Sequence, residues 1–278
     1  MIAGADASET GPLADRAGRL RIPRSAIART IKWLPIAFDP TFKDLRSQRE
    51  VPPVYTSVEW LSVERILKGL SQFQKRVYPK HRDLFQKLAL GQRPAALFIT
   101  CADSRIDPCM LTQTKPGELF ICRIIGNVVP PYPDAIGGVS ATIEYAVGVL
   151  GVPDVIVCGH TDCGVLKGVL NPEPLEPLTS VTAWLNYAQP ARKAVAHLEK
   201  TLSGLEFLLA VTERNVVEQL SNLGTHPAVA ARLEQGDLGL HGWLYDLGEG
   251  SVTAYDPDRA AFVPLESPKP KLRAGRHP

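Results

Sequence analysis

The most regular feature of this chain is a series of short apolar runs separated by helical patterns. Three runs rich in β-branched and aromatic residues cover 95–101, 118–125 and 154–160, and stretches such as 137–151 between them carry apolar residues at helical spacing. Buried strands of a parallel sheet form continuous apolar runs, because helices cover both faces of the sheet. The sequence therefore predicts an α/β fold with a mostly parallel β-sheet flanked by helices.

The last third of the chain shows two different periodicities. Helical patterns cover 179–188 and 204–224, whereas 238–247 and 251–256 alternate with period two around the glycine-rich link 248–250. Alternation of this kind on both sides of a short glycine-containing link is typical of a β-hairpin. We therefore expect an antiparallel hairpin at the edge of the sheet.

An amphipathic helix is predicted ahead of the first strand, over residues 57–78. Trp60, Val63, Leu67 and Leu70 share one face of this pattern, and polar residues occupy the other positions. Such a stripe is typical of an amphipathic helix.

Residues 1–55 differ in composition from the rest of the chain. They contain six prolines and a basic stretch, 16–32, that has no acidic residue. The short basic helical pattern at 24–34 is compatible with a membrane surface or a partner subunit, and packing on its own protein is the favoured interpretation. We interpret 1–55 as an N-terminal helical arm, 56–265 as the catalytic domain and 266–278 as a flexible tail.

Composition and charge exclude several classes of protein. The 278 residues are 45% hydrophobic and 22% charged with a net charge of +2, which excludes a disordered chain and gives no indication of nucleic-acid binding. No apolar run reaches the roughly 18 residues of a membrane span, and the first residues lack the basic and apolar order of a signal peptide. The expected location is therefore the cytoplasm.

Two strand ends carry metal-binding side chains. Cys101 ends the first apolar run, while His160 ends the third and is followed by Cys163. Ligands of open α/β sheets bind outside the carboxyl ends of the strands, and two thiolates with one imidazole are a known catalytic zinc set that leaves a fourth position open. A CxxC redox pair or a Cys-His-Asp nucleophile would leave one of these residues unused. The pattern predicts one zinc ion held by these three side chains.

Longer segments around these residues resemble the β-class carbonic anhydrases. The resemblance lies in CADSR, PGELFICRIIGNVVPPY, GGVSATIEYAVGVLGV and VIVCGHTDCGVLKGVL, and it spans roughly 60–257. The later stretch RLEQGDLGLHGWLYDLGEGSVTAYD resembles the bacterial and cyanobacterial, carboxysome-associated branch. The resemblance implies zinc-dependent reversible hydration of carbon dioxide to hydrogencarbonate and a proton, by a zinc-bound hydroxide. It also implies a catalytic pair formed by Asp103 and Arg105, which taken alone would be a surface ion pair or a helix cap.

The same resemblance implies a substrate pocket and an oligomer. Its residues match here at Gln92, Phe120, Ile125, Tyr145 and the backbone amide of Gly164, several of which come from the adjoining subunit in the family. We therefore expect a homodimer or a higher even oligomer, although Phe120, Ile125 and Tyr145 taken alone would be plain core.

Other functions and partners stay open from the sequence. Carbonyl sulfide or carbon disulfide hydrolysis on the same zinc site is one alternative, and a zinc-bearing scaffold is another. Such a scaffold would dock to a transporter or a carboxysome shell through residues 1–55.

One position departs from the family, since Ile124 stands where Asn is common.

Overall fold

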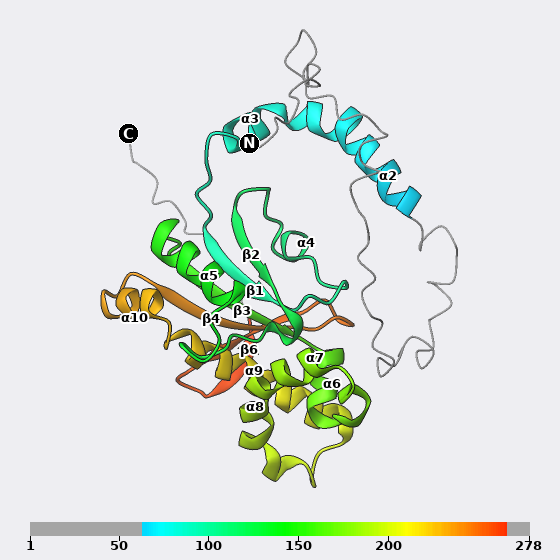
Figure 1. Cartoon of the computed structure of the whole chain (residues 1–278), viewed down its shortest axis with the longest axis vertical. Coiled ribbons are helices and arrows are strands. Elements are labelled where there is room, and N and C mark those ends of the chain that lie inside the picture. Colours follow the sequence, from blue (N-terminus) through cyan, green and yellow to red (C-terminus); the bar gives the residue numbers. More distant parts are fainter. Residues whose placement is uncertain (1–62, 266–278) are drawn as a thin grey trace, which may run out of the picture. The chain divides into compact units, whose positions relative to one another are not determined.

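One mixed sheet organises the computed structural model, which describes residues 63–265. The six strands of this part of the chain follow the order β2-β1-β3-β4-β5-β6 (Figure 1). They are β1 (Ala96–Thr100), β2 (Leu119–Arg123), β3 (Asp154–His160), β4 (Gly239–Tyr245), β5 (Val252–Asp256) and β6 (Ala261–Pro264). The pairs β2–β1, β1–β3 and β3–β4 are parallel, while β4–β5 and β5–β6 are antiparallel. The predicted fold class is confirmed, and β6 extends the predicted hairpin by one strand.

Helices connect and cover these strands. They are α2 (Val63–Gln72), α3 (Arg82–Leu88), α4 (Pro108–Thr112), α5 (Gly138–Glu144), α6 (Gly164–Leu170), α7 (Thr179–Leu185), α8 (Gln189–Ala194), α9 (Gly204–Leu223) and α10 (Pro227–Glu234). The long helix α9 begins with a capping box, in which the Ser203 hydroxyl accepts from the Glu206 amide and the Glu206 carboxylate accepts from the Ser203 amide. This helix contacts both β3 and β4 in the middle of the sheet.

The two faces of the sheet follow from the alternation of side chains along each strand. Leu97, Ile99 and Val155 point to one face, where they form a buried core with side chains of α5, α9 and α10. Phe98 and Ile156 point to the other face and pack near Leu111 of α4 and Trp243 of β4. Because both faces are apolar, the strands have the continuous apolar sequence that predicts them.

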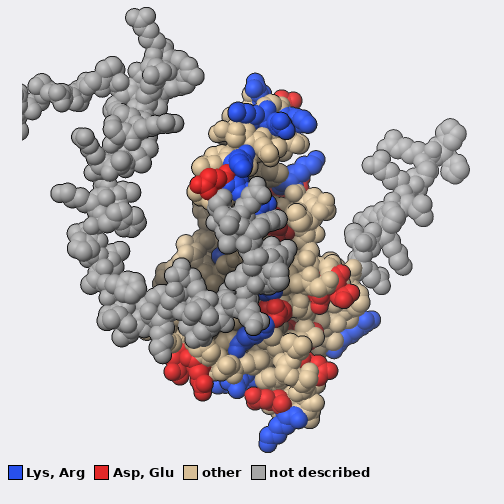
Figure 2. Space-filling model, turned by 90° about the vertical axis from the view of Figure 1, so that its right-hand side faces the viewer, with Lys and Arg blue, Asp and Glu red and all other residues tan. Residues whose placement is uncertain are grey.

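The N-terminal part of the described chain is helical from Val63 to Leu88 with changes of pitch. Helix α2 continues through a π-helical turn (Phe73–Val77) and a 3-10 turn (Tyr78–His81) into α3. The predicted apolar stripe is present on α2, where Val63 and Leu67 are 60% and 57% exposed. Figure 2 shows basic side chains gathered at the top of the coloured, described part of the chain, over this helical segment.

Some predictions fall on residues outside the described part of the chain. These are the arm 1–55, the tail 266–278 and the first residues of the predicted helix, including Trp60. The domain boundaries therefore stay predictions. Between residues 63 and 265, no helix has the length and apolar character needed to cross a membrane.

Candidate metal centre

The three predicted ligands meet at the carboxyl edge of the parallel strands. Cys101 follows the last residue of β1, and His160 is the last residue of β3. These strands are adjacent and parallel, with Thr100 in register with Cys158, so their ends lie side by side. The ligand atoms of Cys101, His160 and Cys163 all lie within 4.8 Å of one another, and all three residues are buried. The sheet topology thus assembles the set from two separate strand ends.

A tight turn after β3 carries the third ligand back toward the first. The Thr161 amide donates to the Tyr245 carbonyl at 3.0 Å, and Asp162 then adopts a left-handed backbone with φ of 58°. Short polar residues tolerate this conformation better than most. Cys163 follows as the N-cap of α6, and its sulfur lies 4.0 Å from that of Cys101.

The histidine presents an unpaired nitrogen to this cluster. His160 Nδ1 lies 2.8 Å from the Thr161 carbonyl oxygen, which can only accept, so we assign the ring proton to Nδ1. His160 Nε2 is therefore a lone-pair donor, and it is buried without a hydrogen-bond partner in the described structure. A buried nitrogen left this way is costly unless a metal ion takes its lone pair. The residues present therefore fit a zinc ion.

The two thiols behave as an electrostatic pair. Hydrogen bonding from Cys163 is the main cause that lowers the pKa of Cys101, whereas contact with Cys101 raises the pKa of Cys163. The second thiol resists ionisation because a negative charge already lies beside it. A divalent cation between the sulfurs would remove that penalty, which is why thiolate ligation releases protons. Burial raises the pKa of Cys158 to about 12, as expected for a cysteine that only packs in the core.

A backbone amide and a buried polar network hold Cys101 from the other side. The Gly126 amide donates to Cys101 Sγ at 3.3 Å, in a left-handed conformation with φ of 68° that suits glycine. Asn215 of α9 donates to the Gly126 carbonyl at 3.0 Å, and Gln219 donates to Asn215 Oδ1 at 2.9 Å. Sequence reasoning missed both side chains. Their only signal is that two polar residues, four apart, fall on the apolar face of a long helix.

The predicted catalytic pair, Asp103 and Arg105, lies beside the ligand cluster. Arg105 donates from Nε to Asp103 Oδ1 at 2.9 Å and from Nη2 to Oδ2 at 2.7 Å. This two-point contact is the main cause that lowers the pKa of Asp103 to about 2. Asp103 Oδ2 lies 3.9 Å from His160 Nε2, so an ionised carboxylate borders the position between the ligand atoms. Arg123, which the sequence did not single out, donates to the Cys101 carbonyl at 3.3 Å and to the Asp103 carbonyl.

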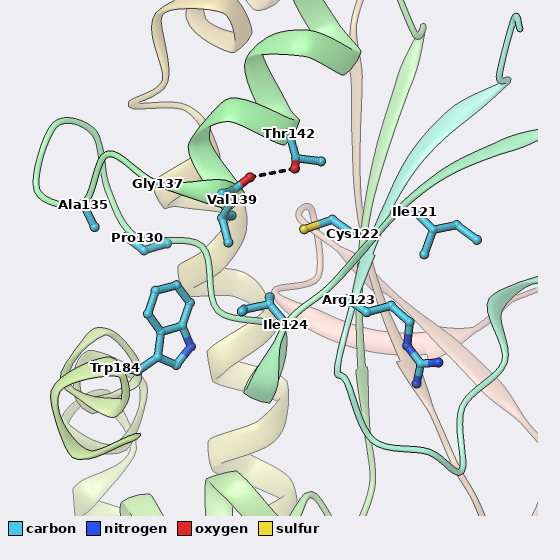
Figure 3. A pocket seen from close by; sticks show the side chains of 11 residues that line it. Ile121, Cys122, Arg123, Ile124, Pro130, Ala135, Gly137, Val139, Thr142 and Trp184 are labelled. Carbon is cyan, nitrogen blue, oxygen red and sulfur yellow. Dashed lines mark hydrogen bonds between the residues drawn. The ribbon is translucent and has the colours of Figure 1, made fainter. Parts of the chain in front are cut away.

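Ile124, which stands where the family commonly has Asn, is partly buried and packs against the core of the sheet. Ile124 lines a cavity of about 410 Å³ together with Trp184, Pro130 and Val139, among other residues (Figure 3). Trp184 donates from Nε1 to the Ile125 carbonyl at 3.2 Å, which fixes the indole next to this segment.

Two of the predicted substrate-binding residues lie next to the ligands. Ile125 directly precedes Gly126, whose amide contacts Cys101. Gly164 directly follows Cys163 and is the first residue of α6. Both positions are therefore supplied by the same chain as the ligands.

The other three predicted substrate residues lie elsewhere in the chain. Gln92 is exposed and precedes β1, at the opposite end from Cys101. Phe120 is in register with Leu97, roughly 10 Å of strand before the carboxyl edge. Tyr145 is 46% exposed, and its ring lies 6.0 Å from that of Phe120. A single chain does not bring these side chains to its own ligand cluster.

Comparisons with known proteins agree with this geometry. The family model described as carbonic anhydrase matches residues 96–252. A carbonic anhydrase of Pseudomonas aeruginosa is 47% identical over 209 residues, which cover 75% of this chain and 94% of that protein. The solved structure of the β-carbonic anhydrase CcaA matches with a TM-score of 0.71 and 43% identity, covering 73% of this chain and 92% of that one. A structure described as one of two tetrameric β-carbonic anhydrases from Sordaria macrospora matches with a TM-score of 0.63 and 28% identity, covering 69% and 95%.

Proposed function

The chain belongs to the β-class carbonic anhydrases, and we propose how its own residues carry out the reversible hydration of carbon dioxide. One zinc ion per subunit would be held by Cys101, His160 and Cys163. The observation that supports this most directly is the buried His160 Nε2, which has no hydrogen-bond partner and lies within 4.8 Å of two sulfur atoms that are 4.0 Å apart. When bound, zinc supplies Lewis acidity and lowers the pKa of water at the open side of the site.

Asp103 would orient the reacting water by accepting a hydrogen bond from it, and Arg105 would hold Asp103 in place. Since the pKa of Asp103 is about 2, its carboxylate is ionised throughout the neutral range. It accepts a hydrogen bond from the reacting water, whereas protonation would abolish that role. Arg105 keeps both carboxylate oxygens engaged, which prevents Asp103 from becoming a fourth ligand.

Substrate orientation would divide between two copies of the chain. Ile125 and the Gly164 amide border the ligands in the same chain, while Gln92, Phe120 and Tyr145 would come from a second copy. The contact between the Phe120 ring and the exposed Tyr145 ring, together with the exposed apolar stripe of α2, supports a homodimer or a higher even oligomer. A cytoplasmic location, and contacts of residues 1–55 with a membrane surface, transporter or carboxysome shell, stay predictions from the sequence.

The test of this function measures zinc and hydration in the same sample. Stopped-flow hydration of carbon dioxide is followed with a pH indicator on the full chain, and zinc per subunit is determined in parallel. Cys101→Ser removes a ligand, so the variant should lose its zinc. Its hydration activity should fall by more than the roughly 100-fold that is typical when a residue outside the ligand set is changed. Cys158→Ala removes a buried thiol that is not a ligand and should keep both.

Two results would contradict the proposal. One is full zinc occupancy with hydration no faster than the buffer reaction, in which case carbonyl sulfide hydrolysis would be tested next on the same protein. The other is unchanged zinc and activity in Cys101→Ser.

A further inference from the structure

Arg105 contacts two carboxylates, and only one of them belongs to the pair described above. Its Nη1 donates to Asp162 Oδ2 at 3.0 Å, and its Nη2 also donates to the Asp162 carbonyl oxygen at 3.1 Å. The guanidinium is therefore held from both sides, with Asp103 on Nε and Nη2 and Asp162 on Nη1 and Nη2. No role for Asp162 follows from the sequence.

Asp162 has an unusual place in the chain. It lies between His160 and Cys163, in the left-handed corner of the turn that brings these two ligands together. Its carboxylate also pairs with Lys167 of α6, so the corner is fixed to the following helix. The contact to Arg105 thus joins the loop that carries Asp103 to the turn that carries two ligands.

We propose that Asp162 is a positioning residue that acts through Arg105 to keep the Asp103 carboxylate turned away from the metal ligands. This inference rests on the proposed function and adds a residue to it. With Asp103 as its only partner, the guanidinium of Arg105 could rotate and carry the carboxylate with it. A second carboxylate and a carbonyl oxygen on the same guanidinium restrict that rotation. Without them, Asp103 Oδ2, now 3.9 Å from His160 Nε2, has only a short distance to move to compete for the metal.

The variants are chosen to separate the side chain from the backbone of the turn. Asp162→Gly removes the carboxylate and keeps the left-handed conformation, which glycine adopts without strain. Asp162→Asn keeps the shape and one acceptor but loses the charge. The matched control is Asp237→Asn, because Asp237 holds Arg232 with the same two contacts, through Oδ1 at 3.0 Å and its carbonyl oxygen at 2.9 Å. This control pair lies near the start of β3, at the opposite end from His160.

The readout is the visible absorption of the cobalt(II)-substituted full chain, titrated with thiocyanate, together with hydration kinetics of the zinc protein. The proposed function requires an exchangeable position on the metal, so the wild-type spectrum should respond to the anion. In Asp162→Gly a large share of the sites should stop responding, and kcat/KM should fall about tenfold, with a smaller loss in Asp162→Asn. Asp237→Asn should match wild type in both measurements.

A double variant makes the inference falsifiable. In an Asp103→Ala background there is no carboxylate to turn, so Asp162→Gly should add no further spectral change. An equal change with and without Asp103, or an unchanged response in Asp162→Gly alone, would overturn the positioning role. If wild type itself neither binds cobalt at the cluster nor hydrates carbon dioxide, the proposed function fails instead.

Discussion

The ligand cluster and the surface patch formed by Phe120 and Tyr145 are built in opposite ways. At the cluster, three buried ligand atoms lie within 4.8 Å of one another, and backbone amides and a buried polar network hold their positions. At the patch, two aromatic rings contact each other, and Tyr145 is 46% exposed. A single chain supplies every ligand of the cluster. The patch, in contrast, keeps apolar surface that no other residue of the described structure buries.

This difference separates the chemistry from the assembly. Metal binding depends on strand order and on a turn, which a single chain supplies by folding. Substrate orientation by Gln92, Phe120 and Tyr145 would depend on a second copy, because their own chain places them away from the ligands. Changes in the two regions should therefore have different signatures in zinc content, size and activity.

The largest expected effect that distinguishes the regions comes from Tyr145→Arg. A charge placed in a buried interface costs several kcal/mol, so the variant should dissociate into single chains. Zinc should stay at one per chain, while hydration should fall by about tenfold or more because the substrate side chains of the partner are lost. Analytical ultracentrifugation, zinc analysis and stopped-flow kinetics measure the three quantities.

Leu205→Arg is the matched control for this variant. Leu205 is an apolar residue of α9 that is 75% exposed, and it belongs to neither region. The control should keep the assembly and the activity of wild type. A Tyr145→Arg protein that dissociates and retains full activity would refute the shared pocket, and one that stays assembled would refute this patch as the interface.

A smaller effect, confined to the cluster, is expected from Asn215→Leu. The substitution leaves the Gly126 carbonyl and Gln219 Nε2 without their present partners, at a cost of about 1–3 kcal/mol in the free energy of unfolding. It also loosens the Gly126 amide that donates to Cys101 Sγ, so zinc affinity should fall about tenfold. Urea denaturation and chelator competition measure the two changes.

Ser221→Ala on the same helix serves as the comparison, since Ser221 is exposed and donates only to a carbonyl of its own helix. It should change neither quantity. If Asn215→Leu loses stability but binds zinc as tightly as wild type, the network supports the fold and has no part in holding Cys101.

How much of this site can be predicted from the sequence depends on how far apart in the chain the interacting residues lie. The ligands Cys101 and His160 can be predicted because both end apolar strands, and strand ends of a parallel sheet meet at one edge. The contacts of Asn215 with Gly126 and of Asp162 with Arg105 join residues 89 and 57 positions apart. No local pattern encodes which of many polar side chains will meet across such distances.

The fold shows the same limit. Strands β1, β3 and β4 have long apolar or alternating patterns and are predicted, while β6 has only four residues and ends in Pro264. Its pairing with β5 depends on the neighbouring strand more than on its own sequence. The change of pitch after Gln72 cannot be seen in the sequence, because Phe73 and Val77 follow Leu70 at the same spacing of three to four residues.

The smallest expected effect lies outside both regions, at Glu213. This side chain lines a cavity of about 410 Å³ between α9 and the last two strands, and burial raises its pKa. A carboxyl group with a raised pKa contributes its stability below the pKa of the unfolded chain and loses it as the pH rises through the folded value. Glu213→Gln should therefore raise the melting temperature by about 1–2 °C near pH 8, a figure reduced for solvent screening, with the difference vanishing toward acid pH.

Glu218 provides the contrast on the same helix. It pairs with Arg214 through Oε1, so Glu218→Gln removes a favourable contact and should lower the melting temperature instead of raising it. Differential scanning calorimetry at several pH values measures both. Because Glu213 and Glu218 belong to neither the cluster nor the patch, zinc content and assembly should match wild type in both variants. A gain in Glu213→Gln that is independent of pH would mean that the substitution improves packing, and that charge burial at Glu213 has no part in the stability of the chain.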